Sequence, residues 1–145
     1  MKNAFNNEIL NSFSSVNKLL YNLAKADAEK NGLTVVQLKA LYKLSSHPNI
    51  GLVELAEHLK LTNSTVSGVV ERLVKHGLVE RKHDPHDRRA ITLNLTPQCE
   101  EKLERVIETE SVFVKKLNLI EERLTEEQLN QLFALHSQIS DILSE

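Results

Sequence analysis

Glycine and proline are scarce in this chain, with four glycines and three prolines among 145 residues. Because these residue types are the strongest breakers of regular structure, their scarcity predicts a chain dominated by helices. Apolar residues recur at helical spacing from Phe5 through Phe13 to Leu23, which predicts a long first helix ending near Gly32. The hydrophobic fraction of 41% is typical of a chain that buries a core.

Capping signals predict three further helices in the first half of the chain. Thr34, with Gln37 three residues later, forms a capping box that opens a second helix. A short third helix is expected over about 52–60. Thr62 opens a fourth helix, and Gly77 is the signal that ends it.

The apolar pattern changes from helical to alternating at residues 91–95, which predicts a strand with its odd-numbered residues on the apolar face. Residues 79–82 can pair with it across the polar loop 83–88, giving a two-stranded ribbon. One fifth helix is expected to begin at Pro97, and Thr125 opens a sixth. We therefore predict a mainly α fold with a small β-wing.

The terminal helices carry wide apolar stripes that a single small module has little means to cover. Large exposed apolar patches are uncommon on monomers, so we expect these helices to pack on each other and on a second copy of the chain. We therefore predict that two copies of the chain form a homodimer through these helices.

Charge is polarised towards the middle of the chain. The net charge of the whole chain is −2, whereas residues 59–92 hold seven lysines and arginines against four aspartates and glutamates. Such a basic segment favours a nucleic-acid partner, and its cations suit phosphate contacts. The cations assigned to phosphates are Lys60, Arg72, Lys75, Arg81 and Lys82.

The fourth helix has one apolar side and one small, hydroxyl-bearing side. At about 100° per residue, Val66, Val70 and Leu73 gather on the core side. A helix that enters the DNA major groove needs little bulk and hydroxyl groups that reach base edges and phosphates. The candidate recognition residues of this helix are Asn63, Ser64, Thr65, Ser67, Gly68, Arg72 and Lys75. The alternative from the helix pattern alone is a pair of scaffold helices joined by a turn.

The loop of the ribbon reads Asp84-Pro85-His86-Asp87-Arg88-Arg89. Guanidinium groups on a thin hairpin tip can enter the narrow minor groove, where the negative potential is strong. We expect Asp87 to orient one guanidinium through an ion pair. The alternative is a solvated hairpin. The candidate wing residues are Arg81, Lys82, His86, Asp87, Arg88 and Arg89.

These segments resemble, in order and spacing, the MarR family of winged-helix regulators. The resemblance is carried by residues 55–59, by 64–73, by 77–81 and, most specifically, by the wing motif 84–89. It implies a two-fold dimer that binds pseudo-palindromic double-stranded DNA operators, usually as a repressor, and that a small molecule or oxidant often releases. By residue match, Ser64, Thr65 and Ser67 are similar to groove-facing recognition residues, and Arg88 and Arg89 to the wing arginines.

The resemblance implies one domain over residues 1–145, with 33–96 as the winged helix-turn-helix lobe that binds DNA. Residues 1–32 and 97–145 then form the dimerisation helices, and an effector pocket is expected between them and the lobe, with its ligand and lining residues unassigned. The chain departs from the family at Gly68, where many members carry a larger polar or basic side chain. We therefore expect the wing, phosphate contacts and DNA shape to supply more of the affinity.

Other candidate sites are weaker. Cys99 lies in the first turn of the fifth helix, where the helix dipole could lower its pKa, but a lone cysteine is most often an apolar filler. His83 and His86 lie beside two aspartates on a loop that must be free to meet DNA, so we expect no metal there. His47, His58 and His136 are expected to be isolated; the last two lie within helices.

No catalytic motif occurs, so the sequence predicts no enzyme and no cofactor. The first residues contain no apolar core of a signal peptide and no long apolar run follows, so we expect a cytoplasmic protein without a membrane partner. One alternative function stays open, which is a winged-helix module that binds proteins without specific DNA readout. Gly68 and the overall acidity favour that alternative, and a salt series would separate the two because only phosphate contacts give a steep salt dependence.

Overall fold

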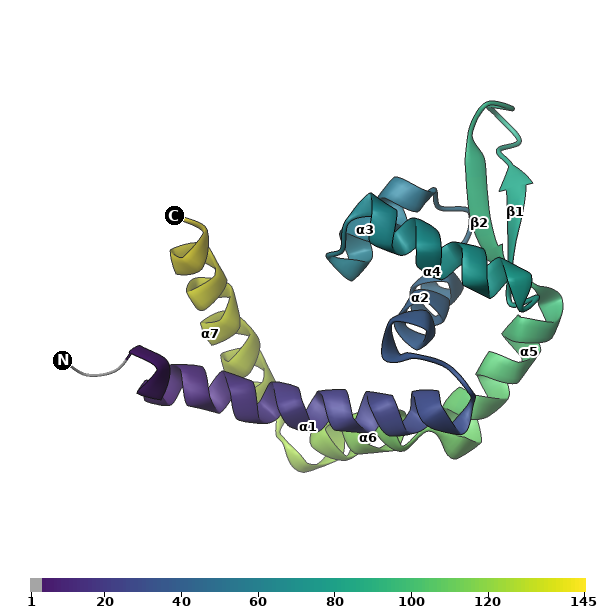
Figure 1. Ribbon diagram of the computed structural model, residues 1–145. Coiled ribbons are helices and arrows are strands. Elements are labelled where there is room, and N and C mark those ends of the chain that lie inside the picture. The colour runs from purple at the N-terminus through teal and green to yellow at the C-terminus, as the bar shows by residue number, and fades with distance from the viewer. Residues whose placement is uncertain (1–3) are drawn as a thin grey trace. The chain divides into compact units, whose positions relative to one another are not determined.

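The computed structural model describes residues 4–145, which form two compact units (Figure 1). The first unit ends at Ser111, and the second covers Val112–Glu145. Met1, Lys2 and Asn3, on which the expectation of no signal peptide partly depends, lie outside the described residues. Within residues 4–145, no helix combines the length and the apolar character needed to cross a bilayer. The predicted class, mainly helical with a small two-stranded wing, is confirmed.

The first long helix, α1 (Glu8–Lys30), is confirmed, although it begins later than the apolar pattern indicates. Phe5 lies in a separate short 3-10 helix, Ala4–Asn6. Asn7 separates the two because its side-chain oxygen accepts the N–H of Ile9 at 2.8 Å, which satisfies a free donor of the first turn. The polar cap therefore sets the start of the helix.

Helix α2 (Val35–Ser46) follows a left-handed turn at Gly32, whose φ is 68°. The predicted capping box is present. Thr34 Oγ1 accepts the N–H of Gln37 at 3.2 Å, and Gln37 Oε1 accepts the N–H of Thr34 at 3.0 Å.

The helix-turn-helix consists of α3 (Leu52–Leu59) and α4 (Asn63–Lys75), which pack against each other and against α2. Lys60 adopts the left-handed conformation with φ 54° in the turn between them, and Thr62 caps α4. Gly77, with φ 71°, ends the α4 region as expected.

The wing consists of two antiparallel strands, β1 (Val79–His83) and β2 (Ile91–Leu95), paired from Val79 opposite Leu95 to His83 opposite Ile91. Ile50 adds a single bridge to β2, since its carbonyl accepts the N–H of Leu93 at 2.8 Å. Nothing in the sequence pattern indicated this third segment, because one bridging residue has no periodicity.

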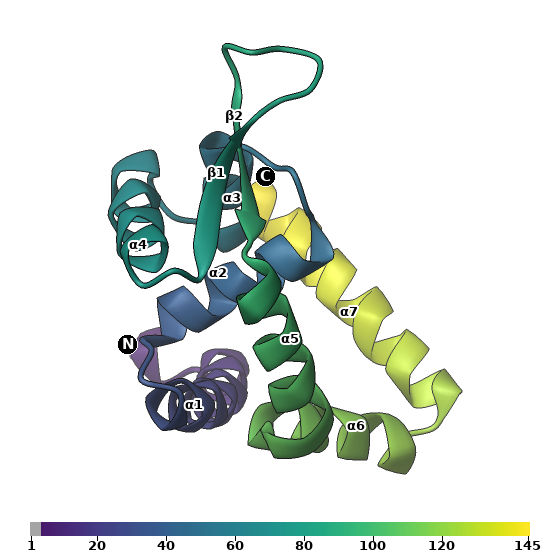
Figure 2. The same ribbon diagram turned by 90° about the vertical axis from the view of Figure 1, so that its right-hand side faces the viewer.

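Two residues of β2 differ from the alternating pattern. Ile91 was expected on the apolar face but is 50% exposed, while Thr92 is buried. The end of the ribbon near the loop extends past the helices, so Ile91 finds no apolar surface to cover it (Figure 2). The Thr92 hydroxyl donates to the carbonyl of Lys82 at 3.3 Å, which satisfies its polar group.

The expected single fifth helix is wrong. Helix α5 (Pro97–Arg105) continues into a π-helical turn, Val106–Glu110, and the chain is extended at Ser111 before α6 (Val112–Arg123) begins. The side-chain hydroxyl of Ser111 donates to Asp27 Oδ2 of α1 at 2.6 Å, and both residues are buried. This contact joins residues 84 positions apart, so local sequence reasoning could not find it.

The second unit contains α6 and α7 (Glu126–Ser144). The predicted capping box at the start of α7 is confirmed, since Thr125 Oγ1 accepts the N–H of Gln128 and Gln128 Oε1 accepts that of Thr125. Many large apolar side chains of α7 are exposed, and Phe133 is 63% exposed.

The core of the first unit joins α2, α3, α4, both strands and α5 in one apolar cluster. This cluster fixes α4 and the wing relative to each other. Its buried members are Ala40, Leu41, Leu44, Ile50, Leu55, Ala56, Val66, Val70, Leu73, Val79, Leu93, Leu95, Cys99 and Leu103.

Candidate nucleic-acid interface

The predicted recognition residues lie on the open side of α4. Val66, Val70 and Leu73 are fully buried on the other side, which fixes the rotation of the helix about its axis. All seven residues of α4 that are predicted to face DNA are therefore exposed. They are Asn63, Ser64, Thr65, Ser67, Gly68, Arg72 and Lys75.

The start of α4 carries a hydroxyl pair. Thr62 Oγ1 accepts the N–H of Thr65 at 3.3 Å and donates to Thr65 Oγ1 at 2.9 Å, so the hydrogen of the Thr65 hydroxyl is available to an outside acceptor. Thr62 is itself exposed at the same end of the helix. The sequence indicated Thr62 only as a cap, but its position directly before the recognition face was a signal that it also belongs to the surface.

Gly68 lies in the interior of α4, where neither the packing nor the backbone conformation of the chain requires a glycine. No atom lies within 4 Å of where a Cβ would stand, and its φ is not positive. Glycine in a helix interior destabilises the fold by about 0.5–1 kcal/mol relative to alanine. The open face at Gly68 lets another molecule approach the helix backbone closely.

The wing loop is shaped by its two aspartates. Asp84 Oδ1 accepts the N–H of His86 at 2.7 Å, and Asp87 Oδ1 accepts the N–H of Arg89 at 3.0 Å. The expected ion pair of Asp87 with a guanidinium is wrong, because its carboxylate holds the loop backbone instead. His83 Nδ1 lies 3.0 Å from the carbonyl oxygen of Arg88, which adds a further cross-link between β1 and the loop.

This backbone bracing presents the loop side chains outward. His86, Arg88 and Arg89 are exposed, as are Arg81 and Lys82 on β1. Figure 2 shows the loop extending beyond the helices of the first unit. A projecting loop with two guanidinium groups has the form required to enter a narrow groove of DNA.

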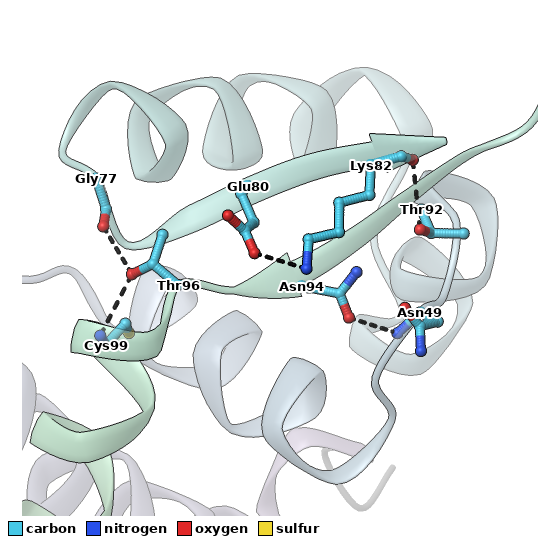
Figure 3. A network of polar contacts seen from close by, with 8 residues as sticks. All are labelled: Asn49, Gly77, Glu80, Lys82, Thr92, Asn94, Thr96 and Cys99. Atoms are coloured by element: carbon cyan, nitrogen blue, oxygen red, sulfur yellow. Dashed lines mark hydrogen bonds and ion pairs between the residues drawn. The ribbon is translucent and has the colours of Figure 1, made fainter. Parts of the chain in front are cut away.

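The base of the wing is fixed by polar contacts to neighbouring elements (Figure 3). The Thr96 hydroxyl donates to the carbonyl of Gly77 at 2.8 Å and accepts the N–H of Cys99 at 3.3 Å, so one side chain joins the end of α4 to the start of α5. Asn94 Oδ1 accepts the N–H of Asn49 at 2.9 Å, which ties β2 to the loop before α3.

Lys82 is not a free cation, because its ammonium lies 3.0 Å from a carboxylate oxygen of Glu80 (Figure 3). Both side chains are partly exposed, and such surface pairs are weak. A phosphate could therefore replace Glu80 as the partner of Lys82 at small cost.

Cys99 is buried in the core rather than poised to react. Burial raises the pKa of its thiol; Lys102 lowers the pKa and Glu100 raises it, both to a smaller extent. Loss of solvent is the largest effect on this pKa, and burial in the core confirms the expectation that this lone cysteine is an apolar filler. Cys99 lines a small apolar cavity of about 30 Å³, together with Leu103 and Val106.

Comparisons with known proteins agree with this arrangement. The model of the MarR family matches residues 33–91. The HTH-type transcriptional repressor MdtR of Bacillus subtilis is 34% identical over 104 residues, which are 71% of this chain and 64% of that repressor. Residues 33–91 of the chain belong to the MarR family. A second Bacillus subtilis protein, the uncharacterized HTH-type transcriptional regulator YfiV, is 33% identical over 46% of this chain and 42% of its own length. The matched part of the chain therefore spans less than two thirds of the length of each of these two relatives.

Solved MarR-family structures share the fold. The multiple antibiotic-resistance repressor from Listeria monocytogenes is 27% identical, with a TM-score of 0.59 over 95% of this chain and 93% of that one. The S. aureus MepR–DNA complex is 23% identical, with a TM-score of 0.74 over 89% and 93%. Bordetella bronchiseptica BpsR is 21% identical, with a TM-score of 0.72 over 97% and 98%. Among these relatives, MdtR is named a transcriptional repressor and YfiV a transcriptional regulator.

Proposed function

We propose that this MarR-family chain is a DNA-binding transcriptional regulator that acts as a homodimeric repressor. The observation that carries the proposal is the placement of two exposed elements on one core. The small, hydroxyl-bearing face of α4 and the arginine-bearing wing loop both project from the cluster that fixes them. MdtR, a named repressor, and MepR, whose structure includes DNA, support this function.

In this proposal α4 enters the major groove, where Ser64, Thr65 and Ser67 contact base edges or phosphates. Arg88 and Arg89 enter the adjacent minor groove, and the cations at the end of α4 contact phosphates. Phosphate contacts supply affinity, whereas the hydroxyl face and the shape of the groove supply specificity. Residues 33–96 are thus proposed as the DNA-binding lobe.

The proposed homodimer is supported by apolar side chains that each unit leaves exposed. On α1, Ile9 and Leu19 are 63% and 65% exposed, and on α7, Ile142 is 65% exposed. Apolar faces of this kind are typical of subunit interfaces. Two recognition helices fixed by one dimer would read pseudo-palindromic half-sites centred about 10 bp apart.

We further propose that a small molecule releases the repressor from its operator. The structure of BpsR is described in terms of regulation of its DNA binding by 6-hydroxynicotinic acid, which supports a ligand-controlled member of the same fold. In one state of the dimer the spacing of the recognition helices fits the operator, and in another it does not. A ligand that binds more tightly to the second state would lower the DNA affinity, at most by the difference between its binding free energies for the two states.

The test is fluorescence anisotropy with the DNA upstream of the gene itself and with a genome-wide fragment pool, across a salt series. The informative variant replaces Arg88 and Arg89 by alanine. Its matched control replaces Arg105 and Arg123, two exposed arginines outside the proposed DNA-binding surface, and so removes the same charge. Because both lie in the proposed dimerisation helices, the control is used only after its dimeric state is shown to be unchanged. We expect the wing variant to bind more weakly and to lose about 3.6 from the log–log salt slope of the dimer, at about 0.9 for each of the four arginines removed from the two wings.

The control variant should retain the affinity and most of the salt slope. If a folded, dimeric protein binds neither DNA above background, or if both variants weaken binding equally, DNA regulation through this surface is refuted. The protein-interaction module would then be the better interpretation, because an apolar protein interface has little salt dependence.

A further inference from the structure

Two histidines from different helices lie against each other beside the helix-turn-helix. His47 caps the end of α2, and His58 lies in the last turn of α3. Their ring centres are 4.3 Å apart with a tilt of 35° between the rings, and both side chains are exposed. The expectation that these histidines are isolated is therefore wrong, and α2–α3 packing is what brings them together.

A backbone contact favours one tautomer of the neutral His47 ring. The Nδ1 atom of this ring lies 3.3 Å from the carbonyl oxygen of Lys43. Because a carbonyl oxygen only accepts, Nδ1 must carry the hydrogen, and Nε2 of the neutral ring then has its lone pair free. A histidine that donates one N–H to a backbone carbonyl and offers the other nitrogen is the usual form of a metal-ligating histidine.

We propose that His47 and His58 form an open binding site for a divalent transition-metal ion of the zinc or nickel type. Imidazole suits these ions, and their bonds to histidine nitrogen are about 2.0–2.1 Å long. Ring centres 4.3 Å apart allow one nitrogen from each ring to reach a shared ion from neighbouring coordination positions. Waters complete the coordination, since within residues 4–145 no group of three or more ligand-type side chains is gathered for a metal.

The charges nearby on α3 favour a cation. Glu54 lies one turn before His58 and Glu57 directly precedes it, and both are exposed. The nearest cations along the chain are Lys60, two residues after His58, and Lys43, whose carbonyl oxygen lies 3.3 Å from His47 Nδ1. An ion held by both rings would join the end of α2 to α3, which is the first helix of the helix-turn-helix.

The experiment is calorimetric titration of the full chain with ZnCl₂ at pH 7.5, repeated with H47Q and H58Q. The matched control is H76Q, which removes another exposed histidine of the same unit. We expect one ion per chain for the unchanged protein and for H76Q. Each of the other two variants should bind more weakly by about tenfold or more.

A second measurement removes any dependence on the folding of the variants. In the unchanged protein, the imidazole NMR signals of His47 and His58 should shift first as Zn²⁺ is added. The proposal is overturned if the unchanged protein takes up no stoichiometric ion, if both variants bind as well as the control, or if the wing histidines His83 and His86 shift first.

Discussion

Glycine at position 68, in the interior of α4, is expected to lower the stability of the fold and to let the helix backbone approach DNA closely. A Cβ at this position would meet no atom within 4 Å, and the backbone is helical, so alanine fits without strain. The change Gly68→Ala should therefore raise the free energy of unfolding by about 0.5–1 kcal/mol, through the better helix propensity of alanine. For a chain of this size, that corresponds to a rise of about 1–4 °C in the melting temperature.

The same methyl group would stand on the face that is proposed to enter the major groove. If the helix backbone contacts the DNA there, the added methyl must displace it, and we expect specific affinity to fall by about tenfold, or 1.4 kcal/mol. Thermal unfolding followed by circular dichroism measures the first effect, and anisotropy with operator DNA measures the second. The expected signature is a more stable protein that binds DNA less well.

Gly77→Ala is the matched control for stability. This position also has no atom within 4 Å of a Cβ, but its φ of 71° is left-handed, so alanine should destabilise the fold by about 1 kcal/mol. The reasoning is refuted if Gly68→Ala lowers the melting temperature. If it raises the melting temperature and leaves specific affinity unchanged, close approach of the DNA at this position is refuted.

Further predictions concern the core and the junction at the end of the first unit. Leu73→Ala removes a fully buried side chain and should lower the free energy of unfolding by about 2–5 kcal/mol in denaturant titrations. Ser111→Ala removes the hydroxyl that donates to the buried Asp27 and should lower it by about 1–3 kcal/mol, whereas a change of less than 0.3 kcal/mol would contradict a structural role. Burial raises the pKa of the Cys99 thiol in the folded state above its ordinary value of 9.0. As the pH rises above about 9, the thiol therefore loses its proton first in the unfolded state, and the free energy of unfolding should fall. Cys99 should accordingly react slowly with a thiol reagent at pH 7.5 until the protein unfolds, and rapid labelling of folded protein would show the reasoning to be wrong.

Local chemistry in the sequence determined where most helices begin and end. Thr34, Thr62 and Thr125 cap helices in the structure because each hydroxyl accepts an N–H only a few residues along the chain. Gly32 and Gly77 adopt the left-handed conformation that other residues avoid. These interactions span a few residues, so the sequence alone predicts them.

The rotation of α4 was equally predictable, because helical periodicity places Val66, Val70 and Leu73 on one side whatever the rest of the fold is. The recognition face follows as the opposite side. The wing motif likewise predicted an exposed arginine-bearing loop, which the structure confirms for Arg88 and Arg89.

Tertiary contacts decided the features that the sequence did not reveal. The helix ends at Ser111, whose hydroxyl donates to Asp27 of a different helix, and His58 meets His47 because two helices pack. Burial raises the pKa of the Cys99 thiol, and this loss of solvent depends on which elements pack over the start of α5. Local hydrogen bonds and periodicity can be read along the chain, whereas distant contacts and burial depend on which surfaces meet after the chain has folded.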